Sequence, residues 1–260
     1  MTIRGDESMK LGSLFDGSGG FPLAGALFGI EPVWASEIEP FPIRVTKLRF
    51  PGMKHLGSVT DVKGDEVEPV DIITFGSPCQ DLSVAGKQAG IHEGERSNLF
   101  FEAIRIIKEM RQRDRDSGRT GLDVRPRFAV WENVPGAFSS NKGEDFRAVL
   151  QAFCDIKEEG RVSIIGPPKH GRWSPAGAIL GHDWSLAWRV YDAQFWGVPQ
   201  RRKRIYLIAD FGSERAGEIL FESEGVCWDT PACREAWKNS SRYVERSPDG
   251  SGWLRWLNYP

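Results

Sequence analysis

One cysteine stands where a chain can present a nucleophile. Cys79 lies in Gly76-Ser77-Pro78-Cys79-Gln80, directly after the apolar run Asp71–Phe75. Pro78 fixes its own backbone and restricts the residue before it, so the thiol is presented in a defined direction. A lone cysteine is more often a buried apolar side chain, but a position after a strand favours a thiolate nucleophile. The segment Gln80–Asn98 that follows is polar and contains glycines, a composition typical of a closing lid.

A glycine-rich turn near the N-terminus has the composition of a nucleoside site. Phe15-Asp16-Gly17-Ser18-Gly19-Gly20 follows a short apolar run. Its glycines let the backbone approach a ligand closely, and the predicted helix after it offers free amide groups. Glu37 follows the next apolar run, where an acid can accept hydrogen bonds from both ribose hydroxyls. Taken alone, Glu37 is more simply a surface carboxylate. Together these features predict a nucleoside cofactor, either a dinucleotide or S-adenosylmethionine.

A third candidate is Glu132, in Trp131-Glu132-Asn133-Val134-Pro135 at the end of a predicted strand. A buried carboxyl group that stays protonated can donate to a ring nitrogen, and burial raises its pKa in that direction. The alternative is that Glu132 caps the helix that follows. The sequence leaves both interpretations open.

A fourth candidate is the cationic run Arg201-Arg202-Lys203-Arg204, just before another predicted strand. Such a run is more often a solvated face than a binding site. Residues two apart in a strand share a face, so we expect Arg202 and Arg204 to point in the same direction.

Short apolar runs alternate with helical patterns along the chain, which predicts an α/β fold with a mostly parallel, doubly wound sheet. Catalytic groups in such a sheet lie at the carboxyl ends of its strands, where the four candidates occur. Residues 111–125 are expected to form a surface loop, and the pattern fades after Phe211. The expected strands are Lys10–Phe15, Val33–Glu37, Asp71–Phe75, Arg127–Trp131, Ser185–Val190 and Arg204–Ala209, and the expected helices are Pro22–Leu27, Pro40–Phe50 and Ser97–Arg111.

The composition is typical of a globular protein, with 40% hydrophobic and 27% charged residues in a chain of 260. No apolar run is long enough for a membrane span, and the N-terminus lacks a signal segment, so we expect a cytoplasmic location. The 4 cysteines and 4 histidines do not have the spacing of a disulfide framework or a zinc site, so no metal is expected. The net charge of −2 requires that any surface for nucleic acid be local.

The order of the motifs is similar to that of the DNA (cytosine-5) methyltransferases. PCQ at 78–80, ENV at 132–134 and QRRKR at 200–204 follow FDGSGG at 15–20 in the order that this family has, and the resemblance runs from about Leu11 to Asp210. It implies a Rossmann-like methyltransferase fold, S-adenosylmethionine as cofactor and double-stranded DNA as substrate, as in a phage or restriction–modification enzyme.

The resemblance also implies roles for individual residues. Cys79 matches the nucleophile, Glu132 the acid that assists at ring nitrogen 3, and Arg202 and Arg204 the pair that holds the cytosine and the catalytic loop. The residues implied in cofactor binding are Phe15, Gly17, Gly19, Gly20, Glu37 and Leu99, of which Leu99 matches a leucine that contacts the adenine.

The chemistry of cytosine agrees with these residue types. Carbon 5 is a poor nucleophile, so the ring must first be activated by addition at carbon 6, for which a thiolate is suited. Proton donation to nitrogen 3 would offset the charge pushed into the ring. Because the target carbon is inaccessible in stacked DNA, the base must be flipped into the site.

Two departures from the family stand out. Ser58 replaces an acid that often binds the adenine amino group; its hydroxyl can accept that bond, whereas Asp61 is out of register. After Asp210 the chain lacks the usual target-recognition region and the Gly-Asn-Ser motif with its returning helix. We therefore expect a catalytic domain at 1–212 and a tail at 213–260, either a minimal DNA-contacting segment or a remnant of the recognition region.

Three interpretations stay open. The first is a DNA methyltransferase, with transfer RNA as a variant substrate. The second is a silent or half-enzyme chain that needs a second chain supplying the recognition and C-terminal elements. The third is a nicotinamide-dependent oxidoreductase with the same glycine turn, which leaves PCQ, ENV and the arginine pair unexplained.

Overall fold

The computed structural model describes residues 8–77, 99–164, 173–197 and 199–221, together with the backbone of 244–246 and 253–259. The chain divides into two compact units. Unit 1 contains Met1–Gly76 and Phe101–Val130, and unit 2 contains Ser77–Phe100 and Trp131–Pro260. The division predicted at residue 212 stays a prediction.

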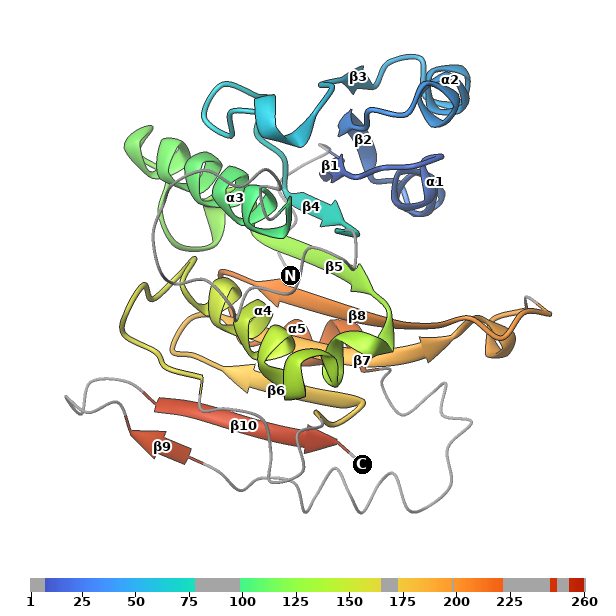
Figure 1. Ribbon diagram of the computed structural model, residues 1–260. Coiled ribbons are helices and arrows are strands. Elements are labelled where there is room, and N and C mark those ends of the chain that lie inside the picture. The colour runs from blue at the N-terminus through green and yellow to red at the C-terminus, as the bar shows by residue number, and fades with distance from the viewer. Residues whose placement is uncertain are drawn as a thin grey trace, which may run out of the picture. The chain divides into compact units, whose positions relative to one another are not determined.

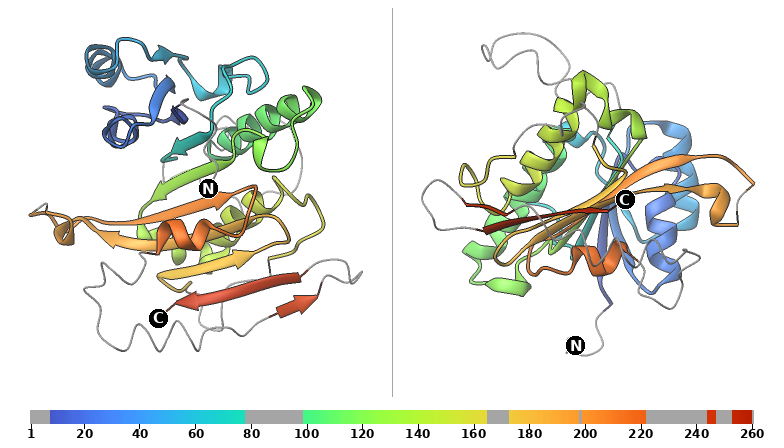
Figure 2. Two further views of the ribbon diagram at one scale, coloured as in Figure 1. Left: turned by 180° about the vertical axis from the view of Figure 1, so that it is seen from behind. Right: turned by 90° about the horizontal axis from the view of Figure 1, so that it is seen from below.

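Unit 1 is a parallel sheet with helices on both faces. Helices α1 (Gly20–Leu27) and α2 (Pro40–Arg49) lie on one face and α3 (Leu99–Asp116) on the other, as the right-hand view of Figure 2 shows. Pairing in parallel joins β1 to both β2 and β4, and β2 to β3. The α/β class and the parallel pairing are thus confirmed here. The strand order is β3 (Lys54–His55), β2 (Glu31–Ser36), β1 (Lys10–Leu14), β4 (Ile72–Phe75) and the first half of β5 (Phe128–Asn133) (Figure 1).

Unit 2 is built on antiparallel pairs. Its helices α4 (Glu144–Cys154) and α5 (Ala216–Leu220) lie on opposite faces of the strands (Figure 2). The strands β7 and β8 form a hairpin, and a short connection of this kind requires antiparallel pairing. The order after the second half of β5 is β8 (Lys203–Asp210), β7 (Ser185–Asp192), β6 (Ala176–Leu180), β10 (Trp253–Tyr259) and β9 (Val244–Arg246).

The core of unit 2 differs between the two faces of β7. Successive strand residues point to opposite faces of the sheet. Trp188 therefore packs on the side of α4, and Ala187 packs on the side of α5. On the α4 side, Phe146 contacts aromatic rings edge-on. On the other side, Ala187 leaves room for Leu220 of α5. The rings around Phe146 are Phe138 at 4.7 Å, Trp173 at 5.5 Å and Trp188 at 5.6 Å between centroids.

Three buried tryptophan rings lie directly against glycines. A Cβ atom at any of these glycines would come within about 2.3 Å of the indole, far closer than two carbon atoms approach. The tryptophans are at most 1% exposed. At each of these glycines, the indole ring therefore fills the space that a side chain would occupy. The pairs are Gly12 with Trp34, Gly177 with Trp188, and Gly181 with Trp184.

Helix α3 is longer than the sequence predicted, because charged residues near its end are buried. The helix expected to end at Arg111 continues to Asp116, so the expected surface loop was wrong for residues 112–116. Asp114 is buried and accepts hydrogen bonds from the Arg125 amide at 2.8 Å and guanidinium at 3.3 Å. Arg111 is buried too and donates to the Val124 carbonyl at 3.2 Å. The charged residues near the end of α3 were therefore not evidence of a solvent-exposed loop.

Within the described residues, no helix is both long and apolar enough to cross a membrane. Nor does this part of the chain bring together three or more His, Cys, Asp or Glu side chains that could hold a metal ion. Cys154 is buried in α4, and burial raises the pKa of its thiol well above the ordinary value. Its environment is that of a core side chain.

Candidate active site

The glycine-rich turn after β1 has a left-handed backbone. The angle φ is +54° at Phe15, +57° at Gly17 and +83° at Gly19. Glycine adopts such angles freely, whereas Phe15 does so at a cost of about 1–3 kcal/mol. A Cβ atom added at Gly17 or Gly20 would meet no atom within 4 Å. The backbone of the turn therefore borders open space where α1 begins.

Glu37 folds back onto this turn from the end of β2. Its Oε2 accepts a hydrogen bond from the Gly17 amide at 2.7 Å. Its Oε1 accepts from the amides of Ile38 at 2.8 Å and Glu39 at 2.9 Å. A carboxylate has about four lone-pair sites, so one site on Oε2 is left for a ligand hydroxyl. The structure brings Glu37 and Gly17 together, and their role in binding a nucleoside stays a prediction.

Asp16 is a buried acid in the same turn that the sequence reasoning did not single out. It is 7% exposed, and neither carboxyl oxygen has a hydrogen-bond partner among the described residues. Burial raises the pKa of Asp16 from 3.8 to about 6; the nearby Ser13 hydroxyl offsets part of this rise, and the Glu37 carboxylate adds to it. Ionisation of Asp16 therefore opposes folding.

Asp16→Asn should remove a pH-dependent loss of stability. Between the unfolded pKa of 3.8 and the folded pKa of about 6, the unfolded chain binds fewer protons, so the free energy of unfolding falls as pH rises. Above this interval the loss is complete, and the substitution should restore up to about 3 kcal/mol. Urea unfolding at about pH 4 and pH 8 measures the difference, with the exposed Asp65→Asn as control. Equal pH slopes in Asp16→Asn and the unaltered chain would show that Asp16 is not responsible.

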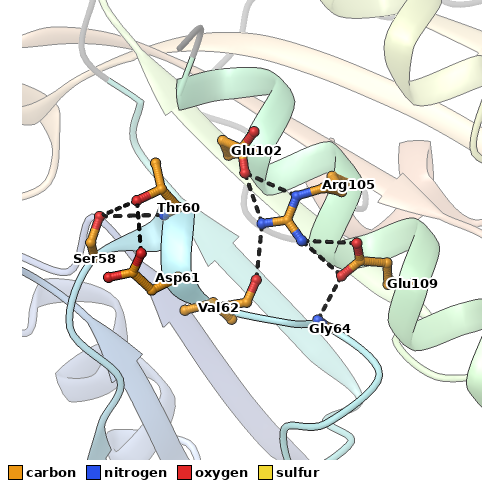
Figure 3. Close-up of polar contacts among 8 residues, drawn as sticks. All are labelled: Ser58, Thr60, Asp61, Val62, Gly64, Glu102, Arg105 and Glu109. Carbon is orange, nitrogen blue, oxygen red and sulfur yellow. Dashed lines mark hydrogen bonds and ion pairs between the residues drawn. The ribbon is translucent and has the colours of Figure 1, made fainter. Parts of the chain in front are cut away.

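Ser58 and Asp61 lie in one 3₁₀ turn, η1 (Val59–Asp61), which Ser58 caps. The Ser58 and Thr60 hydroxyls are 2.8 Å apart, and the Thr60 hydroxyl donates to Asp61 Oδ1 at 3.4 Å (Figure 3). Asp61 is therefore linked to Ser58 although it is out of register with the acid of the family. Leu99, the other residue implied in adenine binding, opens α3 and is half-buried.

The predicted nucleophile Cys79 and the predicted lid Gln80–Asn98 lie outside the described residues. Ser77, two positions before Cys79, is described and is buried. The Trp131 indole donates to the Ser77 hydroxyl at 3.2 Å, and the Asn133 amide group donates to the Ser77 carbonyl at 3.1 Å. Both neighbours of Glu132 in β5 are thus bonded to the segment that leads to Cys79.

Glu132 itself forms an ion pair with Arg204. Arg204 Nε lies 3.0 Å from Glu132 Oε1, and the two side chains are 21% and 23% exposed. Strand β5 continues through Asn133, so the alternative that Glu132 caps a helix is wrong. Among the described residues, the ion pair to Glu132 is made through Oε1.

That Arg202 and Arg204 point in the same direction stays a prediction, because Arg202 lies before β8. Burial raises the pKa of Tyr206, the Glu132 carboxylate adds to the rise, and Arg202 and Arg204 both oppose it. Arg202 precedes β8, is exposed, and donates its amide to Asp192 Oδ1 at 3.0 Å.

The tip of the β7–β8 hairpin presents the cationic run singled out from the sequence, together with aromatic side chains that the sequence reasoning missed. Phe195 is 78% and Trp196 is 58% exposed. Trp196 is held edge-on to Tyr191 at 5.5 Å. The cations Arg201, Arg202 and Lys203 on the returning side are exposed as well. The usable signal was the aromatic pair directly before Gly197, next to the cationic run.

The fold resembles that of a solved DNA modification enzyme. The match is to a crystal structure described as a DNA modification methyltransferase encoded within a prophage (E. coli). The TM-score is 0.54 at 18% identity, covering 92% of this chain and 59% of that one. At this identity the likeness concerns the fold alone.

Curated relatives are methyltransferases that are longer than this chain. The DNA N-6-adenine-methyltransferase of Escherichia phage P1 is 32% identical, over 85% of this chain and 31% of that protein. The type II methyltransferase M.HhaI of Haemophilus parahaemolyticus is 29% identical, over 75% of this chain and 47% of that protein. The chain thus spans less than half the length of either. Residues 9–163 match the model of the family described as C-5 cytosine-specific DNA methylase, and the chain belongs to that family.

Proposed function

We propose that this chain transfers a methyl group from S-adenosylmethionine to carbon 5 of cytosine in DNA, through a covalent adduct with Cys79. The observation that carries the proposal is the arrangement at Ser77. Its hydroxyl and carbonyl are bonded to Trp131 and Asn133, on either side of Glu132, and Glu132 is paired with Arg204. The nucleophile segment, the acid and one arginine of the family are thereby tied into one constellation.

Each residue has a defined task in this mechanism. The Cys79 thiolate adds to carbon 6 of a flipped cytosine, and the electron pair of the broken double bond makes carbon 5 nucleophilic. Glu132 donates a proton to nitrogen 3, and Arg202 polarises the ring carbonyl oxygen. S-adenosylmethionine supplies an electrophilic methyl group. After carbon 5 is methylated, water takes its proton, and the electron pair of the broken carbon–hydrogen bond restores the double bond between carbons 5 and 6 as the sulfur–carbon 6 bond breaks. This returns the thiolate, and nitrogen 3 gives its proton back to Glu132.

The cofactor is assigned to the glycine turn of unit 1. Gly17 and Gly20 border open space, and Glu37 keeps one acceptor site for a ribose hydroxyl. DNA is assigned to the hairpin tip of unit 2, because exposed cations next to exposed aromatic rings suit phosphates and bases. This local surface meets the need raised by the net charge of −2.

The decisive experiment is incubation of the purified chain with S-adenosylmethionine labelled in its methyl group and DNA of mixed sequence. Digestion to nucleosides then shows where the label lies. Label in 5-methylcytosine supports the proposal. Label in N6-methyladenine would assign the activity named for the phage P1 relative and would overturn it, as would methylation of transfer RNA in preference to DNA.

We also propose that a second chain associates with this one and supplies a target-recognition region. Large apolar side chains are exposed on α1 and α2, and apolar exposure of this kind favours association. They are Leu23 (40%), Leu27 (75%) and Phe28 (85%) on and after α1, and Phe41 (65%) and Leu48 (86%) on α2.

The isolated chain should therefore bind DNA weakly and methylate it slowly, and addition of the second chain should restore the rate. Bisulfite conversion of the product reads out both the extent of methylation and its sequence context. Vigorous methylation by the isolated chain, confined to one short motif, would show that no second chain is needed.

A further inference from the structure

The turn at the tip of the β7–β8 hairpin holds two aromatic side chains in the solvent. Phe195 is 78% and Trp196 is 58% exposed, and the tip extends past the end of β6 (Figure 1). Asp192 is buried, and its Oδ1 accepts the amides of Gln194 at 3.3 Å and Arg202 at 3.0 Å. This carboxylate joins the two sides of the tip and gives the turn that presents the rings a defined shape.

A row of aromatic rings supports Trp196 from within unit 2. Its ring lies edge-on to Tyr191 at 5.5 Å between centroids, and Tyr191 lies edge-on to Tyr206 at 5.9 Å. The Arg189 guanidinium lies 5.2 Å from the Tyr191 centroid, and the Tyr191 hydroxyl donates to the Leu220 carbonyl. In an edge-on contact one ring contributes an edge and the other a face. Tyr191 therefore covers at most one face of the Trp196 indole.

The same tip carries positive charge beside these rings. Arg201, Arg202 and Lys203 are exposed, and the sequence contains no acid from 193 to 204. The nearest acid along the chain, Asp192, is buried and bonded to the backbone of the tip. The surface of the tip therefore attracts a polyanion, and a phosphate backbone supplies charge of the required sign at regular intervals.

The exposed rings indicate which form of nucleic acid suits the tip. In a paired duplex the neighbouring bases cover both faces of each base, so a side chain reaches only base edges and the backbone. In an unpaired strand the faces are accessible, and aromatic side chains stack on them while cations bind the phosphates. A duplex would need the cations alone, whereas an unpaired strand uses the cations and the rings together.

We propose that Phe195 and Trp196 form a stacking platform for unpaired bases, and that the chain therefore binds an unpaired strand more tightly than a duplex. The proposal rests on the assignment of DNA to this hairpin tip under the proposed function. One base stacks on Trp196, which Tyr191 supports, and a second stacks on Phe195. The exposed cations of the tip bind the phosphates of the same strand.

The test is a fluorescence anisotropy titration of the full chain with an oligothymidylate and with an abasic strand of the same length and charge. We expect the oligothymidylate to bind about ten-fold more tightly, the scale of stacking one base. Phe195→Ala and Trp196→Ala should each lower this ratio of affinities several-fold. Leu122→Ala, which removes a side chain that is 53% exposed in unit 1, should leave the ratio unchanged.

Three further variants separate stacking from apolar contact and from charge. Phe195→Tyr should keep the ratio, because the substituted side chain still has an aromatic ring. Phe195→Leu should lower the ratio as far as Phe195→Ala does, because it retains apolar surface without a ring. Arg201→Gln should weaken the binding of both strands equally and leave the ratio unchanged, because a phosphate contact is independent of the base.

A ratio near one in the unaltered chain, or an unchanged ratio in both alanine variants, would overturn the platform even if the chain methylates cytosine. Tighter binding of a fully paired duplex with the same number of phosphates would show that the rings do not select unpaired bases. Tighter binding of a peptide of alternating glutamate and phenylalanine would assign the tip to an acidic protein partner. If no strand and no duplex binds, the assignment of DNA to the hairpin tip is itself wrong.

Discussion

Replacing Cys79 with alanine should abolish methyl transfer to cytosine while S-adenosylhomocysteine still binds with unchanged affinity. Without addition at carbon 6, carbon 5 lacks the electron density to attack a methyl group, and an alanine side chain cannot form the adduct. The measurement is incorporation of labelled methyl groups into DNA, together with calorimetric titration of the cofactor product. Cys154→Ala is the matched control, since that thiol is buried in α4 and is expected to have no catalytic role.

Covalent trapping by a mechanism-based inhibitor tests the role of Cys79 independently. With 5-fluorocytosine in the DNA, carbon 5 carries fluorine in place of the proton that elimination must remove. After methyl transfer the adduct between sulfur and carbon 6 should therefore persist and survive denaturing electrophoresis. The unaltered chain and Cys154→Ala should both be trapped. A covalent complex formed by Cys79→Ala would assign the nucleophile to a different residue.

Glu132→Gln should lower the single-turnover rate by at least about 10²-fold, the scale of a lost general acid. The amide has the same shape and its oxygen can still accept a hydrogen bond from Arg204, so the midpoint of thermal unfolding should hardly change. What is lost is the ability to pass a proton to nitrogen 3. The rate is measured with cofactor and DNA both at saturation, so that binding does not contribute.

The control for this substitution is Glu218→Gln. Glu218 forms an ion pair with Arg215 at 2.8 Å, with side chains 64% and 52% exposed, so the same chemical change occurs on a solvated pair. Its rate should match that of the unaltered chain. A full rate in Glu132→Gln would remove Glu132 from the mechanism and leave it as an ion-pair partner of Arg204.

The regular elements of unit 1 were largely predictable because each has a strong local pattern. The apolar β-branched run before Gly76 became β4, and the helical spacing from Leu99 became α3. The β7–β8 hairpin was also predictable, since two apolar runs flank a turn at Gly197. In each case, consecutive residues show the apolar run or the helical spacing that predicts the element.

Other elements were missed because tertiary contacts decide them. Strand β6, with the sequence AGAIL, is poor in β-branched residues, and its Gly177 is explained only by the Trp188 ring beside it. Helix α4 contains Phe146 and Phe153 at helical spacing, but a preceding glycine in a left-handed conformation, Gly143, obscured its start. Strand β5 runs beyond the predicted end because Asn133 is anchored to Ser77, 56 residues away.

The candidate site was likewise predictable only where the sequence contains a local motif. The motifs pointed to Gly17, Glu37, Glu132 and the arginine pair, and the contacts of Glu37 with Gly17 and of Glu132 with Arg204 agree with that grouping. Asp16 was overlooked, because nothing in the neighbouring sequence indicates a buried acid that has no hydrogen-bond partner among the described residues. Residue type reveals possible chemistry, but only contacts reveal a supporting role.

The tryptophan rings that rest on glycines also restrict how this sequence can drift. At Gly12 even alanine would require the indole of Trp34 to move. The substitution of glycine by alanine, which often stabilises a protein, is therefore not tolerated at this position. Loss of the indole first would open a cavity, and gain of the methyl group first would create a clash. Whichever residue is substituted first, the intermediate protein is therefore destabilised, and the same holds for Gly177 with Trp188. We therefore expect each glycine and its tryptophan to be inherited as a pair, replaced together or not at all.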